Sequence, residues 1–219
     1  MKRRIMTLTA AGLLIASGIS TYAGKSENEH QVPASAEEIR PLNIGASVPE
    51  LTLKTVKGRD FDLKAAVSRK PTVLIFYRGG WCPYCTLHLR QVQNAESDLI
   101  KLGYQILAVS PDRPAKLAES VGDSELTYTL LSDSSMAAAK DFGIAYQVDE
   151  ATVEKYKDQG IDLEKASGKD HHLLPVPAVF ILGTDGKVKF VYANPDYTTR
   201  LSPEVMIEAA RAAIEKQKD

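Results

Sequence analysis

Cys82 and Cys85 are the only thiols in this chain of 219 residues. They lie in the stretch VLIFYRGGWCPYCTLHLRQ (73–91), which also contains the single tryptophan. An apolar run typical of a buried strand leads into two glycines, and Pro83 suits the first position of a following helix. Cys82 would then stand at the helix N-cap, where free backbone N–H groups and the helix dipole favour a thiolate. The sequence therefore predicts a reactive dithiol rather than a structural cross-link, because closing so short a loop adds little stability.

The residues around this pair suggest how it would react. Cys85 follows three residues after Cys82, on the same helix face and within reach of it. If Cys82 becomes a sulfenic acid or a mixed disulfide, Cys85 can displace the partner and close a Cys82–Cys85 disulfide. Trp81 would shield the thiolate and offer a flat contact surface. Arg78 either stabilises an anion at Cys82 or is an exposed charge at the end of a strand, and the sequence leaves both interpretations open.

The elements that would hold the dithiol predict an α/β fold. Strands are expected at 71–77, 104–110 and 126–133, helices at 83–103, 114–122 and 134–143, then a β-hairpin at 177–192 and a closing helix at 201–217. Alternation of strands and helices indicates a mainly parallel central sheet covered on both faces, with active groups at the ends of strands. A separate N-terminal hairpin is expected around Lys57-Gly58. The stretch 145–174 reads as an inserted helix and loop that the pattern does not place.

The first residues have the features of a secretion signal. Lys2, Arg3 and Arg4 precede an apolar stretch, and Thr21 and Ala23 are small residues at a cleavage position. We therefore predict a signal peptide at 1–23, a flexible polar linker at 24–43 and one domain at 44–217. Ordinary secretion and the twin-arginine route both stay open. The prediction places the protein outside the cytoplasm, in the periplasm or a similar compartment.

Composition and charge exclude several kinds of partner. The whole chain has 27 basic and 28 acidic residues, and three of the basic residues lie in the predicted signal. Removing the signal leaves a mildly acidic protein, which does not attract nucleic acid or an anionic membrane. No later apolar run is long enough to span a membrane, so no stable span is expected after cleavage.

Several motifs together resemble the peroxiredoxin-like branch of the alkyl hydroperoxide reductase and thiol-specific antioxidant (AhpC/TSA) family. They are FYRGGWCPYC, VSPD, LSD, PVPAVFILGTDGKVKFVY and the N-terminal GASVPELTLKTVKGRDFDL, which span roughly residues 44–215. The resemblance implies a thioredoxin-like fold, a mixed sheet flanked by helices, with an N-terminal β-hairpin extension. It also implies that Cys82 is the attacking cysteine, that Cys85 is the second cysteine of the motif, and that Pro177 packs opposite the disulfide, usually with a cis peptide bond.

The sequence departs from the family pattern at one position. Peroxiredoxins carry a threonine or serine three residues before the attacking cysteine, and its hydroxyl and an arginine hold the peroxide oxygens; here that position is Gly79. The leading hypothesis is a thiol-dependent peroxidase that needs no cofactor. In it Cys82 attacks hydrogen peroxide or an organic hydroperoxide, and an external thioredoxin-like dithiol protein reduces the resulting disulfide. The alternative is an exported thiol–disulfide oxidoreductase acting on protein disulfides, which the WCPYC motif and Gly79 both favour.

A third hypothesis comes from another class of protein, copper binding. Cys82, Cys85 and His88 are spaced along one helix face, and His171 and His172 precede the proline segment. Thiolates suit Cu(I), but this spacing is not diagnostic of a metal site. A packing or surface role is the simpler interpretation for all three histidines, and no metal is included in the predicted site.

Overall fold

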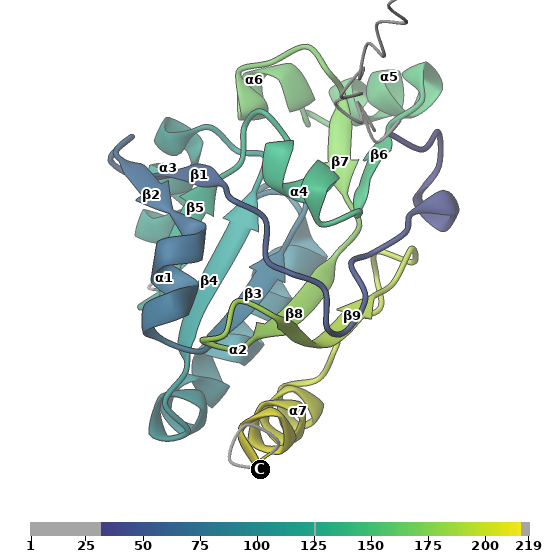
Figure 1. Ribbon diagram of the computed structural model, residues 1–219. Coiled ribbons are helices and arrows are strands. Elements are labelled where there is room, and N and C mark those ends of the chain that lie inside the picture. Colours follow the sequence, from purple (N-terminus) through teal and green to yellow (C-terminus); the bar gives the residue numbers. More distant parts are fainter. Residues whose placement is uncertain (1–31, 125, 216–219) are drawn as a thin grey trace, which may run out of the picture.

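The computed structural model describes residues 32–124 and 126–215 (Figure 1). The predicted signal peptide, residues 1–23, lies outside this range. Within the described residues no helix is long and apolar enough to cross a membrane.

The strands and helices follow the alternating order that the sequence predicts. The strands are β1 (Thr52–Thr55), β2 (Asp60–Asp62), β3 (Thr72–Phe76), β4 (Gln105–Ser110), β5 (Thr129–Ser132), β6 (Ala145–Gln147), β7 (Leu173–Pro175), β8 (Ala178–Leu182) and β9 (Val188–Ala193). The helices are α1 (Leu63–Arg69), α2 (Pro83–Lys101), α3 (Pro114–Ser124), α4 (Ala137–Asp141), α5 (Glu150–Asp158), α6 (Leu163–Ser167) and α7 (Pro203–Glu215), with a 3₁₀ turn η1 (Ala36–Glu38) before them.

A seven-stranded sheet forms the centre of the fold, in the order β2-β1-β5-β4-β3-β8-β9. Strands β3, β4 and β5 are parallel, while β1, β2, β8 and β9 pair antiparallel with their neighbours. The mixed central sheet and the N-terminal β1–β2 hairpin are therefore confirmed. In β3, the middle strand of the α/β core, every residue is buried.

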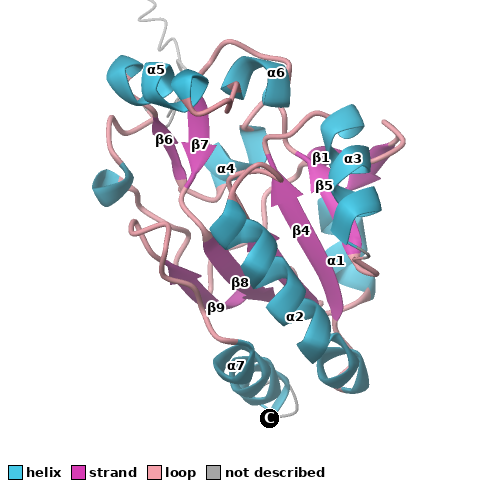
Figure 2. Ribbon diagram, turned by 180° about the vertical axis from the view of Figure 1, so that it is seen from behind, coloured by secondary structure: helices cyan, strands magenta, loops and turns pink. Residues whose placement is uncertain are grey.

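Helices cover both faces of this sheet. Figure 1 shows α1 and α4 in front of it, and Figure 2, from behind, shows α2 and α3 across the other face with α7 beside α2. Successive side chains of β3 alternate between the two layers: Leu74 and Phe76 pack in the α1–α4 layer, while Val73 and Ile75 pack against α2. This alternation is the two-residue period of a strand buried on both faces.

The predicted flexible linker needs correction over its described part, residues 32–43. This segment lies along the domain, where the backbone N–H groups of Arg40 and Leu42 donate to the carbonyls of Gly143 and Phe142, each at 3.0 Å. Ile39 and Leu42 are partly buried against the core. The prediction rested on the polar composition of the segment. It gave too little weight to the few apolar residues that anchor the segment, and it could not include hydrogen bonds made by the backbone.

The insertion, residues 145–174, forms a small subdomain. Strands β6 and β7 pair antiparallel, and helices α5 and α6 lie between them in sequence. Asp149 and Asp162 cap the two helices, accepting from the backbone N–H groups of Thr152 and Lys165, each at 2.9 Å. Both figures show α5 and α6 at one end of the molecule, beyond the strands β6 and β7. The insertion thereby brings Tyr156 of α5 to the segment that follows β3.

Candidate active site

The dithiol lies at the junction of strand β3 and helix α2, as the sequence predicts. Cys82 is the N-cap residue of α2 and Pro83 is its first helical residue. The Cys82 carbonyl accepts from the N–H groups of Cys85 and Thr86 at 3.0 and 3.1 Å, which starts the helix. Both cysteines are free thiols and each is only 1% exposed. The reactive sulfurs are therefore inside the protein, not on its surface.

The pKa values of the two thiols are shifted in opposite directions. Hydrogen bonding from the Cys85 thiol, and then the charges of Arg78 and Arg200, lower the pKa of Cys82 to about 6, although burial opposes this. The pKa of Cys85 is raised well above its usual value, first because its S–H donates to Cys82 and second because it is buried. At neutral pH the pair thus holds one thiolate, at Cys82, and one thiol, at Cys85.

Arg78 is buried, with 2% of its surface exposed, so the interpretation as an exposed strand-end charge is wrong. Its guanidinium lies among three aromatic rings, with ring centroids 5.2 Å away at Trp81, 5.5 Å at Tyr156 and 4.1 Å at Tyr197. One Nη2–H donates to the Tyr156 hydroxyl. Aromatic faces attract a cation, so this cage keeps a desolvated positive charge beside Cys82.

Trp81 forms one wall of this cage. Its ring centroid lies 5.8 Å from that of Tyr156. A Cβ atom built on Gly79 would come within 2.3 Å of Trp81 Nε1 and 3.0 Å of Asp112 Oδ1. Gly79 also has φ +146°, which side-chain-bearing residues rarely adopt. The indole therefore occupies the space that a side chain at position 79 would need, and this accounts for the departure from the family pattern.

Asp112 holds the glycine segment before Cys82 in place through hydrogen bonds. It is 2% exposed, and one carboxylate oxygen accepts from the Gly80 N–H at 2.7 Å and from the Ser110 hydroxyl at 3.1 Å. Burial raises the pKa of Asp112 to about 6. The carboxylate ties the end of β4 to the glycine segment before Cys82.

Pro177 is buried beside the end of β3, and its peptide bond does not have the expected geometry. Ala178 pairs with Phe76, so Pro177 lies beside the end of β3, from which Arg78 and the dithiol follow. No peptide bond among the described residues is cis, so the expectation of a cis bond at Pro177 is wrong. The chain runs on from β7 into β8, with the Val176 N–H donating to the Ile144 carbonyl at 2.8 Å. A trans bond suits this continuous course.

The three histidines of the copper hypothesis have other partners. His88 is buried and its Nε2 lies 3.1 Å from the Leu201 carbonyl, while burial lowers its pKa to about 4. His171 Nε2 lies 3.0 Å from the Ser134 carbonyl, and His172 Nε2 lies 2.7 Å from Glu164 Oε1. Within residues 32–124 and 126–215 no group of three or more His, Cys, Asp or Glu side chains is arranged to hold a metal ion.

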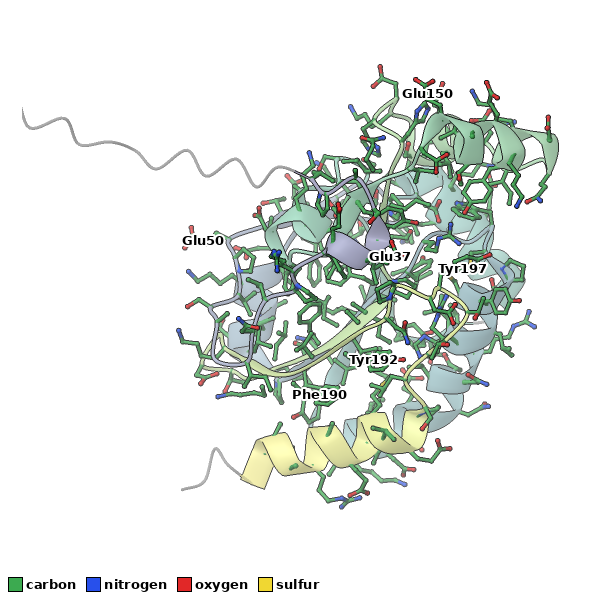
Figure 3. All side chains as sticks on the ribbon, turned by 90° about the vertical axis from the view of Figure 1, so that its right-hand side faces the viewer. Glu37, Glu50, Glu150, Phe190, Tyr192 and Tyr197 are labelled. Atoms are coloured by element: carbon green, nitrogen blue, oxygen red, sulfur yellow. The ribbon has the colours of Figure 1, made fainter. Side chains whose placement is uncertain are left out.

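Sequence reasoning missed three side chains of the site: Tyr156, Tyr197 and Arg200. Tyr156 comes from the insertion. Tyr197 and Arg200 come from the segment between β9 and α7, where Figure 3 shows Tyr197. Neither stretch has a periodic pattern or a motif that links it to the cysteines, so only the tertiary structure shows the contact.

The family model for the AhpC/TSA family matches residues 44–191. This chain belongs to the AhpC/TSA family. Among curated proteins it is 33% identical over 106 residues to the putative peroxiredoxin bcp of Haemophilus influenzae, covering 48% of this chain and 68% of that protein. It is 27% identical over 201 residues to the chloroplastic Peroxiredoxin Q of Arabidopsis thaliana, covering 89% and 82%.

Solved peroxiredoxins share the fold of this AhpC/TSA protein. Peroxidoxin BcpB from Mycobacterium tuberculosis aligns with a TM-score of 0.61 at 21% identity, over 80% of this chain and 97% of that one. A mutant of Peroxiredoxin 6 from Arenicola marina aligns with a TM-score of 0.67 at 20% identity, over 81% and 76%. The predicted thioredoxin-like fold is confirmed. The family assignment and its peroxiredoxin relatives make this chain a peroxiredoxin-type oxidoreductase, a thiol-dependent peroxidase.

Proposed function

We propose that Cys82 is the residue that attacks the peroxide and that Cys85 then closes a disulfide with it. The Cys82 thiolate attacks one peroxide oxygen, the O–O bond breaks, and hydroxide leaves and takes up a proton to become water. Cys82 is then a sulfenic acid. Cys85 attacks the Cys82 sulfur, the S–O bond breaks, and the Cys85 proton leaves with the hydroxide as a second water. Two thiols and one hydrogen peroxide thus give one disulfide and two waters.

The observation that carries this proposal is the buried guanidinium of Arg78 beside a stabilised thiolate. The Nε–H of Arg78 is buried and has no partner among the described residues, while Nη2 is engaged by Tyr156. A donor left free in an apolar cage favours an anionic or strongly polar ligand, since an unpaired buried N–H is costly. A peroxide oxygen that gains charge as its O–O bond breaks is such a ligand. Arg78 would therefore act without the family's hydroxyl.

The burial of the site favours a small oxidant. Because both sulfurs are only 1% exposed, hydrogen peroxide fits the closed site better than a bulky hydroperoxide or a folded protein disulfide. The Cys82–Cys85 disulfide would be reduced by an external thioredoxin-like dithiol protein through a mixed disulfide. Reduction then needs some opening of the site.

One observation favours the alternative, a thiol–disulfide oxidoreductase. Gly79 provides no hydroxyl for the peroxide, and the indole of Trp81 fills the place of one. A dithiol with one thiolate and one buried thiol also suits exchange with protein disulfides. The two functions differ in the oxidant that reacts fast, so one experiment separates them.

The experiment follows Trp81 fluorescence after rapid mixing of reduced protein with hydrogen peroxide or with a disulfide-bonded protein. The peroxidase proposal predicts a fast, peroxide-dependent phase that Cys82→Ser abolishes. Its rate should rise with pH and level off above about 6, because the pKa of Cys82 is lowered to that value and the thiolate is the nucleophile. A peroxide rate no faster than that of a free thiol, together with rapid exchange against the protein disulfide, would favour the alternative.

We also propose that the protein is exported. The basic start at Lys2, Arg3 and Arg4 and the cleavage pattern ending at Ala23 support this. Sequencing the N-terminus of protein recovered from an extracytoplasmic fraction should show Gly24 as the first residue. Full-length protein that stays in the cytoplasm would contradict export.

A further inference from the structure

The segment between β9 and α7 closes over the dithiol. Tyr197 stacks on the guanidinium of Arg78, with 4.1 Å from its ring centroid to Cζ, and meets Tyr84 of the Cys-Pro-Tyr-Cys motif at a centroid distance of 5.9 Å. Figure 3 shows Tyr197 on this connection. His88 anchors the other end of the segment through the Leu201 carbonyl, with Nε2 at 3.1 Å. The segment is thus held to α2 at two points, on either side of Arg200.

Arg200 lies between these anchors in the sequence, and its guanidinium contacts its own segment and Cys85. Its Nη1 donates to the carbonyls of Tyr197 and, at 3.1 Å, Thr199. Its Nη2 lies 3.5 Å from the sulfur of Cys85. None of the ion pairs in residues 32–124 and 126–215 includes Arg200. The guanidinium is oriented by its own loop and directs a charged donor at a buried sulfur.

The two steps of the proposed reaction need a thiolate at different sulfurs. In the reduced protein Cys82 is the thiolate, and the Cys85 S–H keeps its proton and donates a hydrogen bond to it. Once Cys82 has become a sulfenic acid it no longer carries that charge, and Cys85 must lose its proton to attack. Cys85 is then a buried thiolate, which needs a nearby positive charge or strong donor.

We propose that Arg200 is a catalytic residue of the second step, in which its guanidinium stabilises the Cys85 thiolate while that sulfur attacks Cys82. This inference rests on the proposed function. The two arginines would then act in different steps. Arg78, in its aromatic cage, stabilises the Cys82 thiolate in the first step, and Arg200 stabilises the Cys85 thiolate in the second. Hydrogen bonds to a charged group are stronger than neutral ones, so the contact gains strength as the thiolate forms.

Few other groups face Cys85. From its own helix these are Cys82 and, near Arg200, the neutral His88. From the chain after β3 they are the backbone of Arg78 and the hydroxyl of Tyr77, whose pKa is raised by burial so that it stays protonated. When the Cys82 charge is gone, Arg200 is the one cationic side chain among these groups whose donor contacts the Cys85 sulfur.

The test separates the two steps in time. After mixing with peroxide, the first phase of Trp81 fluorescence should depend on peroxide concentration and the second should not; Cys85→Ser should remove the second. The comparison is made near pH 8, because Arg200 also helps to lower the pKa of Cys82 and the first phase would slow at lower pH. There we expect in Arg200→Met a first phase within about two-fold of wild type and a second phase slowed roughly 10- to 100-fold, from the loss of one charged hydrogen bond. The pH midpoint of the second phase should move up by about one unit or more.

Two matched variants complete the design. Arg200→Lys keeps the charge and should restore part of the second-phase rate, which a purely structural role does not predict. Arg211→Met removes an exposed arginine that pairs with Glu208 on α7, and should behave as wild type. A slowed first phase with an unchanged second phase in Arg200→Met would overturn the inference and assign Arg200 to Cys82. Two unchanged phases would overturn it as well.

A second measurement does not depend on peroxide. Cys82 is first converted to a mixed disulfide with a small thiol, and release of that thiol by Cys85 is timed. Here Cys85 forms a bond to the Cys82 sulfur and the small thiolate leaves. Arg200→Met should slow the release as it slows the second phase. If the wild-type protein fails to react with peroxide but Arg200→Met still slows this release, the proposed function is wrong and the role of Arg200 stands. An unchanged release would overturn the role itself.

Discussion

Replacing Gly79 with serine would put back the type of residue that the AhpC/TSA family carries before its attacking cysteine. The structure predicts that this change harms the protein rather than improving it. The new Cβ would lie 2.3 Å from Nε1 and 2.8 Å from Cδ1 of Trp81, and 3.0 Å from Asp112 Oδ1. Either the indole swings out of its place against Arg78 and Tyr156, or the loop before Cys82 shifts.

The cost can be worked from two contributions. A residue with a side chain held at φ +146° is strained by about 1–3 kcal/mol. Overpacking against the indole and the carboxylate adds about 1–3 kcal/mol. The free energy of unfolding of Gly79→Ser should therefore fall by about 2–6 kcal/mol. That is a large part of the stability of an ordinary domain, about 5–15 kcal/mol.

The matched control is Gly160→Ser at the end of α5. Gly160 also has a positive φ, +79°, but nothing lies within 4 Å of a Cβ built there. This variant should carry only the strain of the left-handed backbone, about 1–2 kcal/mol. Urea unfolding followed by far-ultraviolet circular dichroism compares the two, and Trp81 fluorescence of the folded proteins reports whether the indole has moved. Peroxide consumption is measured on the same samples.

Gly79→Ser should be the less stable variant, with altered Trp81 fluorescence and a slower peroxide reaction than wild type. The reasoning fails if Gly79→Ser unfolds at the same urea concentration as Gly160→Ser and consumes peroxide faster than wild type. That result would mean that a hydroxyl fits beside the indole.

Other substitutions test the remaining groups. In Arg78→Met the pKa of Cys82 should rise by about one unit, so the peroxide rate near pH 6 should fall by roughly five-fold or more in stopped flow; an unchanged rate would refute the role of Arg78. Burial raises the pKa of Asp112 to about 6, so the folded state binds a proton that the unfolded chain releases above about pH 4, and stability falls as pH rises through this window. Asp112→Asn, which does not titrate, should therefore gain about 3 kcal/mol of unfolding free energy relative to wild type between about pH 4 and 8, and a pH-independent difference would contradict this. Tyr156→Phe leaves a buried Nη2 donor of Arg78 without its partner and should cost about 1–3 kcal/mol in urea unfolding, whereas the exposed Tyr84→Phe should cost little.

The position of the dithiol could be predicted from sequence because every signal for it is local. An apolar strand, two glycines, a cysteine at the N-cap and a proline at the first helical position lie within a dozen residues. Each of these residues favours a particular backbone conformation that does not depend on the rest of the chain. The N-cap position of Cys82 and the start of α2 at Pro83 are what these signals predict. The alternation of strands and helices predicts a mainly parallel sheet, which is wrong beyond the pairs β3–β4 and β4–β5. The mixed sheet is instead what the family resemblance implies, because the antiparallel pairing of β1 and β8 with the core has no local signal.

The surroundings of the dithiol could not be predicted, because they are assembled from distant segments. Tyr156 is 78 residues from Arg78 along the chain, and Arg200 is 115 residues from Cys85. Neither residue lies in a motif, and the role of each depends on a contact that forms only when the chain folds. The conformation of Pro177 is a different case: its sequence fits both isomers, and in the structure the chain continues from β7 into β8 through a trans bond.

The absence of a hydroxyl at position 79 and the aromatic cage are best understood as one arrangement. With no side chain at Gly79, the indole of Trp81 can lie against the backbone and face Arg78. The same indole packs on Tyr156, which accepts from the guanidinium. The indole of Trp81 thus fills the space that a hydroxyl-bearing side chain would take, and it keeps the guanidinium of Arg78 desolvated and oriented. Electrostatic stabilisation of charge on a reacting oxygen needs a fixed donor in a dry site rather than a particular residue type. A variant that restores the hydroxyl must therefore displace the ring that holds the arginine, so the two solutions exclude each other in this fold.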